Sequence, residues 1–328
     1  MQNFEGRLAV VTGGGTGMGR ELVCQLIAAG AHVAMCDVSA DNMAETTQLA
    51  AASPSQKLTS HVCDVSDEQQ VLAFRDAVVA EHEASHINLL FNNAGIGGGG
   101  EFVDGDRAEW ERTFAVCWYG VYYNCRAFMD LLMASDEGHI INTSSVNGFW
   151  ATIGPNVSHT AYSAAKFAVK GFTEALLTDL RLNAPHVKAS LVMPGHIGTS
   201  IAMNTAKVLG HSDALNMSAD EVGEVRERLL AAGHPVGNVP DDHIRQMIHQ
   251  RGLDFRDKAP TTASQAASII LDGVRNEQWR ILVGEDAHRL DEAVRAAPED
   301  AYEEHFIDRL RSNGVFNELI QATDDSEV

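Results

Sequence analysis

The chain has 328 residues and carries 24 lysines and arginines against 45 aspartates and glutamates, for a formal net charge of −21. A hydrophobic content of 45% and a charged content of 21% are ordinary for a globular protein with a large core, and they exclude a disordered chain. The acidic excess argues against a nucleic-acid-binding surface, which needs clustered lysine and arginine.

Neither a membrane span nor a metal site is predicted. No apolar run reaches the roughly 18 residues that a spanning helix needs, and residues 1–6 lack the features of a secretory signal. The five cysteines lack metal-site spacing, so we expect reduced thiols in a cytoplasmic protein. His82 and His86 are expected on one helical face, but without a third ligand we interpret them as surface residues.

The first two hundred residues alternate β-rich runs with helical patterns. Strands are predicted at 8–11, 32–36, 58–62, 87–91, 139–142 and 187–193. Helices are predicted between them, one of them starting at a capping box from Ser66 to Gln69. Strands separated by helices imply right-handed crossovers and a parallel sheet covered on both faces. We therefore expect a doubly wound, Rossmann-type α/β fold with three layers.

The pattern changes after residue 199. Residues 200–258 contain no strand-like run but two amphipathic helices, one beginning at a Ser218–Glu221 capping box and one ending at Gly252. A further helix begins at Thr262, and one more strand covers 281–283. We expect a single domain over residues 1–284, with 200–258 as a helical lid over the substrate. Residues 285–328, with 13 acidic and 4 basic residues, form an acidic C-terminal extension.

A glycine-rich turn separates the first predicted strand from its helix. Residues 12–19 read T-G-G-G-T-G-M-G, and such glycines permit a tight turn and close approach of the backbone to a pyrophosphate. The following helix N-terminus favours an anion. A glycine cluster alone could be only a flexible loop, but Asp37 follows the second strand 20 residues after Gly17. That spacing is typical of a carboxylate that binds ribose hydroxyls, so the turn predicts a dinucleotide site.

The G-x-x-x-G-x-G spacing resembles that of the classical short-chain dehydrogenase/reductase (SDR) family. Further family motifs follow in order: Asp64-Val65, the N-N-A-G motif at residues 92–95, and P-G-x-x-x-T at 194–199. The resemblance implies that Asp64-Val65 contacts adenine and that Ile197 and Thr199 hold the nicotinamide carboxamide. The predicted cofactor-binding residues are Gly13, Thr16, Gly17, Met18, Gly19, Asp37, Asp64, Val65, Asn93, Ala94, Gly95, Tyr162, Lys166, Pro194, Gly195, Ile197 and Thr199.

Asp37 also bears on which nicotinamide cofactor is used. Its charge would accept hydrogen bonds from the ribose hydroxyls of NAD and repel the 2′-phosphate of NADP. Relatives place a basic residue for that phosphate at positions that are Thr16 and Val38 here. We expect no cation to await the extra phosphate, and we predict NAD(H).

Tyr162 and Lys166 form the family's Y-x-x-x-K motif, and residues four apart lie on one face of a helix. In isolation such a pair is usually a surface pair. A phenol has a pKa of about 10, too high for a base at neutral pH, but a neighbouring ammonium favours the phenolate. We expect this arrangement to lower the Tyr162 pKa, so that Tyr162 moves the substrate proton. The resemblance also gives Lys166 a hydrogen bond to the nicotinamide ribose.

Ser145 is the third predicted catalytic residue, with Ser144 as the alternative. The resemblance places the family's substrate-binding serine at the end of the fifth strand, where its hydroxyl would polarise a carbonyl. By itself such a serine would be a turn or cap residue. The spacing from Ser145 to Tyr162 is longer than expected for the family, so 150–159 is predicted to form a loop beside the site.

Cys117 is a departure from the family pattern. It occupies the position of a catalytic asparagine that supports a water relay to the lysine, and a thiol is a poor substitute for an amide. Hydride transfer needs no nucleophile, so we interpret Cys117 as a small packing residue. The departure keeps open a non-catalytic, dinucleotide-binding regulator as an alternative function.

The leading hypothesis is an NAD-dependent enzyme that interconverts secondary alcohols and ketones. Met203, Met217 and Met247 of the predicted lid suit an adaptable pocket for a bulky apolar substrate, although they could equally pack only against the domain. An NADP-dependent reductase of the same fold is the other enzymatic alternative. The resemblance implies a homotetramer or homodimer built through the fourth and fifth helices. We expect a small-molecule substrate and no nucleic-acid or membrane partner.

Overall fold

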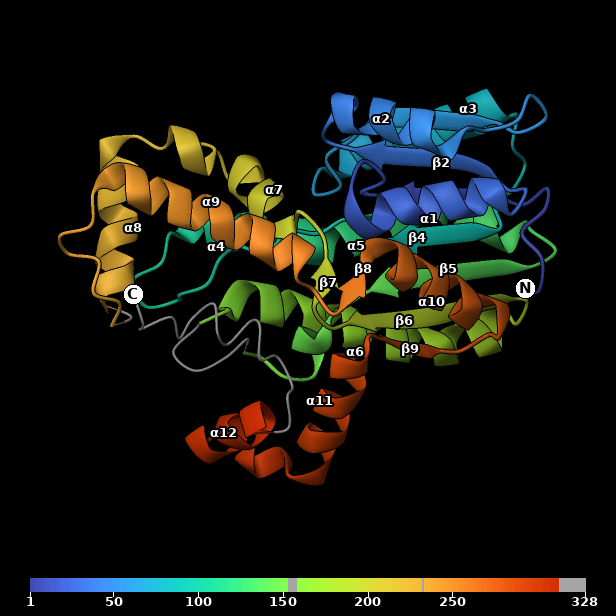
Figure 1. Ribbon diagram of the computed structural model, residues 1–328. Coiled ribbons are helices and arrows are strands. Elements are labelled where there is room, and N and C mark those ends of the chain that lie inside the picture. Colours follow the sequence, from blue (N-terminus) through green and yellow to red (C-terminus); the bar gives the residue numbers. More distant parts are fainter. Residues whose placement is uncertain (153–157, 232, 313–328) are drawn as a thin grey trace.

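A parallel sheet forms the centre of the protein, as the sequence predicts. The computed structural model describes residues 1–152, 158–231 and 233–312. Within them, seven strands lie in the order β3-β2-β1-β4-β5-β6-β9 (Figure 1). The strands are β1 Leu8–Thr12, β2 His32–Asp37, β3 Leu58–Val62, β4 Leu89–Asn92, β5 Gly138–Thr143, β6 Val187–Pro194 and β9 Arg280–Val283. The strand order reverses between β1 and β4, which is where doubly wound sheets bind their ligands.

Helices cover both faces of this sheet. One face is covered by α1 Gly17–Ala28, α2 Ala40–Ala50 and α10 Ala263–Arg275. The other is covered by α3 Glu68–His82, α5 Gly120–Met133 and α6 Thr160–Asn183, with α4 Arg107–Phe114 and the π-helix η1 Ala115–Tyr119 leading into α5. None of the described helices combines the length and the apolar character needed to cross a membrane.

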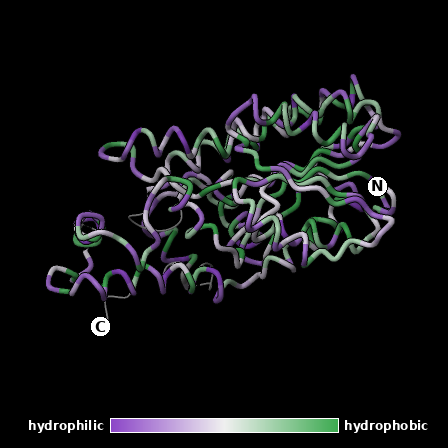
Figure 2. The backbone as a smooth tube through the Cα atoms, turned by 90° about the horizontal axis from the view of Figure 1, so that it is seen from above, coloured by the Kyte–Doolittle hydropathy of each residue, from purple (hydrophilic) through white to green (hydrophobic). Residues whose placement is uncertain are grey.

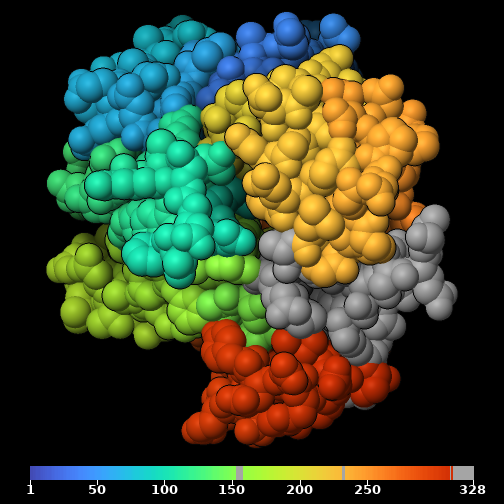
Figure 3. All heavy atoms as spheres, turned by 90° about the vertical axis from the view of Figure 1, so that its left-hand side faces the viewer, coloured from blue at the N-terminus to red at the C-terminus, as the bar shows by residue number. Residues whose placement is uncertain are grey.

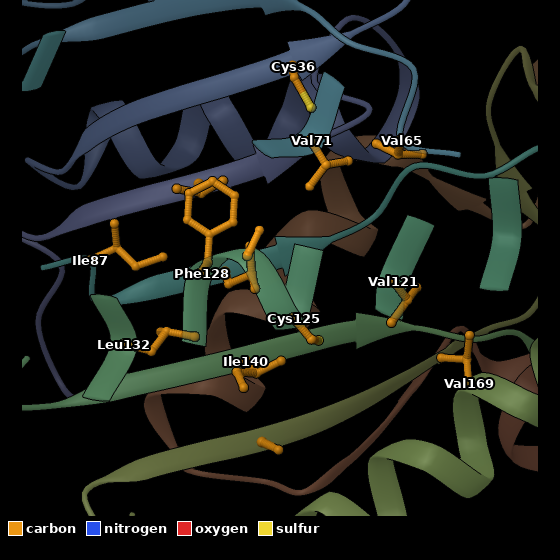
Figure 4. Close-up of a cluster of buried hydrophobic side chains, with 14 of the residues drawn as sticks. Cys36, Val65, Val71, Ile87, Val121, Cys125, Phe128, Leu132, Ile140 and Val169 are labelled. Atoms are coloured by element: carbon orange, nitrogen blue, oxygen red, sulfur yellow. The ribbon is translucent and has the colours of Figure 1, made fainter. Parts of the chain in front are cut away.

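The core consists of two apolar layers, one on each side of the sheet. Val10 packs into the layer beneath α3, α5 and α6, and its neighbour Val11 packs into the opposite layer. Because successive strand residues face opposite sides, a sheet covered on both faces needs continuous apolar runs. Figure 2 shows these strands as hydrophobic stretches at the centre of the molecule. Phe128 of α5 is fully buried in the first layer (Figure 4).

Three helices follow β6 and its short extension: α7 Ile201–Val208, α8 Ala219–Ala231 and α9 Asp241–Asp257. The predicted capping box is confirmed, because Ser218 N donates to Glu221 Oε2 (2.7 Å) and Glu221 N to Ser218 Oγ (3.2 Å). The sequence interpretation missed α7. It was also wrong about Gly252, which lies inside α9, where a Cβ would approach Met203 Cγ to 2.9 Å. Met203 of α7 therefore packs against α9.

The extension continues as α11 Glu285–Ala296 and α12 Glu304–Ser312 (Figure 1). Its apolar side chains, including Phe306, pack against Val146 and Trp150 of the segment that follows β5. The Trp150 indole donates to the Ala301 carbonyl at 2.7 Å. The described part of the extension is therefore attached to a segment beside the predicted catalytic serine. The remaining helical turns are η2 Val146–Gly148, η3 Ala214–Asn216 and η4 Pro298–Asp300, and the two-residue strands are β7 Ile197–Gly198 and β8 Thr261–Thr262.

Two local predictions were wrong. The N-cap of α3 is Asp67 rather than Ser66, because the Asp67 carboxylate accepts from the backbone N–H groups of the first turn while Ser66 Oγ donates to Asp64. His82 and His86 do not share a helical face, since α3 ends at His82. His82 is half-buried at 2.9 Å from Thr59 Oγ1, and burial lowers its pKa to about 4.

The described residues contain no cluster of three or more side chains suited to a metal ion. All five cysteines lie within the described residues and are free. Cys36, Cys63, Cys117 and Cys125 are buried among core side chains, so they act as small apolar packing residues.

Phe128→Ala should lower the free energy of unfolding by about 3–5 kcal/mol, because it leaves a cavity in the layer that α5 closes. Leu182→Ala is the control: this side chain is 76% exposed near the end of α6, so its truncation should change stability by less than about 0.5 kcal/mol. Urea denaturation of both variants measures the difference. Equal effects would contradict the assigned core.

Candidate active site

A cavity of about 760 Å³ lies at the carboxyl ends of the strands. The loops after β1, β2, β3 and β4 line it together with α7, and its volume is that of an ordinary cofactor site. Figure 3 faces the end of the molecule that carries α7, α8 and α9. The predicted residues that line the cavity are Gly13, Thr16, Gly17, Met18, Asp37, Asp64, Val65, Asn93, Ala94, Gly95 and Thr199.

The turn between β1 and α1 needs its glycines for close packing. Gly13 has a φ of +66°, and a Cβ there would lie 2.8 Å from Ala94 Cα. Gly17 has a φ of +54° and faces Thr199. A Cβ on Gly19 would come within 1.9 Å of the Gly13 carbonyl oxygen. Gly19 does not line the cavity, but its lack of a side chain allows α1 to pack against the turn. The exposed backbone of this turn suits a pyrophosphate.

Asp37 is fixed at the end of β2 with its carboxylate toward the cavity. Oδ2 accepts from Gly15 N and Oδ1 from Ser39 N, both at 3.0 Å. An ionised carboxylate has about four acceptor positions, so these two bonds orient Asp37 and leave capacity for hydroxyl donors. The arrangement fits the predicted ribose contact.

The expectation that no cation lies near this end of the cavity was wrong. Arg20 lines the cavity and donates to the Gly15 carbonyl at 2.7 Å and to Glu45 Oε2 at 2.6 Å. Arg20 comes from α1 rather than from the residues next to Asp37, and the sequence interpretation considered only Thr16 and Val38. Because Glu45 pairs with it, Arg20 is a partly neutralised cation.

Asp64, the predicted adenine contact, is already bonded within the chain. Its Oδ2 pairs with Arg112 at 2.7 Å and its Oδ1 accepts from Ser66 Oγ at 2.7 Å. Burial acts to raise the Asp64 pKa, but the bonds from Arg112 and Ser66 outweigh burial and hold the pKa below its usual value. Arg112, on α4, is a cavity residue that sequence spacing did not reveal.

The three predicted catalytic residues meet where β5 ends beside α6. Lys166 Nζ lies 5.3 Å from the centre of the Tyr162 ring and donates to the Thr143 carbonyl at 2.9 Å. The Ser145 side chain lies close enough to the Tyr162 phenol to act on its pKa, and its Oγ accepts from Asn147 N at 3.1 Å. Ser144 Oγ instead donates to the Lys166 carbonyl at 2.8 Å, so Ser145 is the serine placed next to the tyrosine.

The expectation of a lowered Tyr162 pKa was wrong, because the pKa is raised. Burial raises the Tyr162 pKa, and the Cys117 thiol adds to this effect, while Lys166 and Ser145 act to lower it. The net pKa lies above the ordinary value, because burial penalises the phenolate more than one ammonium stabilises it. The chain by itself therefore keeps Tyr162 protonated.

Cys117 lies in η1, the π-helical turn between α4 and α5. Its side chain is fully buried, and Sγ donates to the Ile96 carbonyl at 3.2 Å. A Cβ on Gly95 would lie 3.5 Å from Lys166 Nζ and 3.7 Å from Cys117 Sγ, so the thiol sits near the lysine. Single π turns in helices occur frequently at functional sites. The thiol fills this space while bonded to backbone.

His159 is a neighbour of Tyr162 that the sequence interpretation treated only as loop. Its ring stacks on the Tyr162 ring with 4.7 Å between centres, and Nε2 lies 3.2 Å from the Gly97 carbonyl. Burial lowers the His159 pKa, which favours a neutral imidazole. The predicted loop 150–159 lies partly outside the described residues. The signal that could have found this contact is the run of four glycines at 97–100.

Of the predicted cofactor-binding residues in the segment 194–199, only Thr199 lines the cavity, and the others pack behind it. Thr199 is part of the wall, whereas Gly195 packs against Asp286 and Ile197 is buried and pairs with Thr261 of β8. Pro194 ends β6. The backbone position of this segment therefore depends on contacts from α11 and β8.

Comparison with known proteins decides the family. The family model for short chain dehydrogenase matches residues 7–209. The chain belongs to the short-chain dehydrogenase/reductase family. It is 35% identical over 295 residues to the protein SadH of Mycobacterium tuberculosis, covering 90% of this chain and 92% of that one. Epidermal retinol dehydrogenase 2 of Mus musculus is 31% identical over 201 residues, which are 61% of this chain and 63% of the mouse protein.

Solved SDR structures match as well. An SDR from Burkholderia phymatum in complex with NAD is 27% identical and superposes with a TM-score of 0.70, covering 92% of this chain and 95% of that one. A metagenomic short-chain oxidoreductase in complex with NADP is 33% identical, with a TM-score of 0.52 over 58% of this chain and 83% of that one. The protein is an SDR oxidoreductase with a fold that binds a nicotinamide cofactor.

Gly19→Ala should weaken NADH binding at least about tenfold, a change of about 1.4 kcal/mol, because its Cβ would displace the Gly13 carbonyl. Gly171→Ala is the matched control, since a Cβ on this exposed α6 residue meets nothing within 4 Å. NADH fluorescence titration measures both. Unchanged affinity in Gly19→Ala would argue that this turn does not hold the dinucleotide.

Proposed function

We propose that this SDR uses NAD(H) to interconvert a bulky, apolar secondary alcohol and its ketone. The observation that carries the proposal is the convergence of Ser145, Tyr162 and Lys166. The three do not line the cavity themselves, but Lys166 Nζ lies directly behind Gly95 of its wall, which also carries the glycine cradle and Asp37. A nicotinamide bound in this cavity supplies the hydride acceptor for oxidation and the hydride donor for reduction.

Each of the three side chains has a distinct task in this proposal. Ser145 donates a hydrogen bond to the substrate oxygen and stabilises the developing alkoxide. Tyr162 gives its phenolic proton to that oxygen during ketone reduction, and the phenolate takes the proton back during alcohol oxidation. Lys166, fixed by the Thr143 carbonyl, places a positive charge next to the phenol in both directions.

The raised Tyr162 pKa has a consequence for direction. A phenol that stays protonated at neutral pH is ready to donate a proton, which suits ketone reduction. Alcohol oxidation needs the phenolate, so it depends on stabilisation by Lys166 and becomes faster as the pH rises toward the Tyr162 pKa.

The choice of NAD(H) rests on Asp37. Its carboxylate is held by Gly15 and Ser39 and would face a 2′-phosphate directly. Both NAD and NADP occur in the solved relatives, so the family does not choose between them. Arg20 supports the alternative, an NADP(H)-dependent reductase, but Glu45 compensates its charge.

The substrate class rests on the helices after β6. Ile201 and Val208 of α7 line the cavity as apolar side chains. One relative is named a retinol dehydrogenase, and retinol is a bulky apolar alcohol, which supports this substrate class. Residues 200–258 act as the lid of a single domain that spans 1–284 in this proposal.

We also infer a homo-oligomer, tetramer or dimer, formed through the fourth and fifth helices of the sequence interpretation, which are α4–α5 and α6 in the structure. Tyr119 and Tyr122, at the junction of η1 and α5, are 41% and 37% exposed although large and aromatic. Such residues are enriched in subunit interfaces. The five free thiols fit a cytoplasmic protein.

Tyr162→Phe should lower kcat by about 10²–10⁴-fold, because the proton donor is lost, while NADH binding stays within twofold of the parent. The assay follows NADH absorbance with a panel of bulky secondary alcohols and their ketones. Ser145→Ala should also lose activity, whereas its matched control Ser144→Ala, whose hydroxyl bonds only backbone here, should not lose more than a few-fold. Activity retained in Tyr162→Phe would overturn the mechanism. A parent that binds NADH but turns over none of the panel would favour a non-catalytic regulator.

The parent should show a kcat/KM for NAD that exceeds that for NADP by at least about 100-fold, or about 2.7 kcal/mol. Asp37→Ser should lower the ratio of kcat/KM for NAD to that for NADP, because it removes both the contact with the NAD ribose hydroxyls and the repulsion of the NADP 2′-phosphate. Asp41→Asn is the control, since it removes a carboxylate from the same cavity wall without touching Gly15. A preference of the parent for NADPH would refute the cofactor assignment.

A further inference from the structure

Asp286, the second residue of α11, ties the C-terminal extension to the segment 194–199. Its side chain is only 8% exposed, and Oδ2 accepts from His196 N at 2.6 Å. A Cβ on Gly195 would lie 2.2 Å from the same oxygen, and a Cβ on Gly284 would lie 2.4 Å from Oδ1. The carboxylate therefore presses directly on the backbone of residues 195–196, in a space that only glycine leaves open.

His196 holds the same segment from the lid side. It is 5% exposed, its Nε2 lies 2.7 Å from the Phe255 carbonyl, and its ring centre lies 4.3 Å from that of Phe255. Phe255 belongs to the last turn of α9. One residue of the segment thus contacts the extension through its backbone and the lid through its side chain.

We propose that Asp286 is a positioning residue: it holds the segment 194–199 in the shape that binds the nicotinamide end of the cofactor. This inference rests on the proposed nicotinamide-binding role of that segment. Oδ2 bonds the backbone rather than another side chain, so Asp286 sets where the segment runs. Thr199, three residues on from His196, packs against the Gly17 turn and lines the cavity.

Asp286 acts on the segment 194–199 through a short stretch of its backbone. Gly195 N donates to the Val283 carbonyl at 2.9 Å, and Ile197 pairs with Thr261 of β8. Between these two backbone anchors the buried N–H of His196 has Asp286 Oδ2 as its acceptor. Without that acceptor the peptide group must turn to find another partner, since a buried N–H is not left unpaired.

Asp291 provides a matched control on the same helix. It is also 8% exposed, but within the described residues its side chain bonds Arg280 and Arg295 rather than the segment 194–199. Removing Asp291 therefore removes a buried carboxylate and its ion pairs from α11 while leaving the acceptor for His196 in place.

The test compares Asp286→Ala, Asp286→Asn and Asp291→Ala in the full-length protein, by NADH fluorescence titration, kcat and Tm. Asp286→Ala should raise the Kd for NADH at least tenfold and lower kcat. Asp286→Asn keeps an acceptor oxygen and should stay within threefold of the parent. Asp291→Ala should lower Tm with an unchanged Kd. Gly195→Ala, which pushes the segment away from an intact Asp286, should reproduce the higher Kd if Asp286→Ala does not fold.

Three results would overturn the inference. One is a Kd for Asp286→Ala within twofold of the parent. Another is an equal rise in Asp291→Ala, which would mean that both carboxylates act only through stability. The third is a Gly195→Ala variant that binds NADH normally while Asp286→Ala is unfolded. A parent that binds neither NADH nor NADPH would refute the proposed function and this inference together, whereas normal binding in the parent isolates the role of Asp286.

Discussion

The site depends on one buried cation. Lys166 is 3% exposed, and a buried ammonium is costly unless it is paired or hydrogen-bonded. The Thr143 carbonyl at the end of β5 provides that bond, so the charge fixes α6 against the sheet. Because Tyr162 lies one turn before Lys166 on α6 and Ser145 follows β5, this bond also brings Tyr162 next to Ser145. The same burial that makes the ammonium expensive also raises the Tyr162 pKa, and the proposed chemistry depends on the balance between these two effects.

Most of the fold and the centre of the site follow from local sequence patterns. Parallel strands need apolar runs, turns at the strand ends need glycine, and residues four apart share a helix face, so the predicted strands and the Tyr162–Lys166 pair agree with the structure. What the sequence did not reveal depends on tertiary contacts. Arg20 reaches the cavity from a helix position whose spacing carries no signal. His159 stacks on the Tyr162 ring beside the glycine run 97–100, a signal that the sequence interpretation did not connect with it. At Ser66, two adjacent residues could both cap the helix, and Asp67 provides the cap.

The C-terminal extension contacts two segments beside the proposed site. Trp150 and Val146 connect α11 and α12 to the segment after Ser145, while Asp286 connects α11 to the segment after β6. Two segments beside the proposed catalytic residues therefore contact the extension, which lies outside the region matched by the family model, residues 7–209.

Cys117, by contrast, lies inside the matched region. It occupies a position that the family pattern gives to asparagine, and its thiol bonds to the backbone.

The glycines at 97–100 allow three helices to meet where side chains would keep them apart. A Cβ on Gly98 would come within 2.6 Å of Leu209, just beyond α7, and a Cβ on Gly99 within 2.7 Å of Ala161 at the start of α6. Gly97 N also donates to Thr205 of α7 at 2.8 Å. The positions of α7 and of the first turn of α6 are therefore linked through this glycine segment. Any side chain added at Gly98 or Gly99 would therefore have to displace Leu209 or the start of α6.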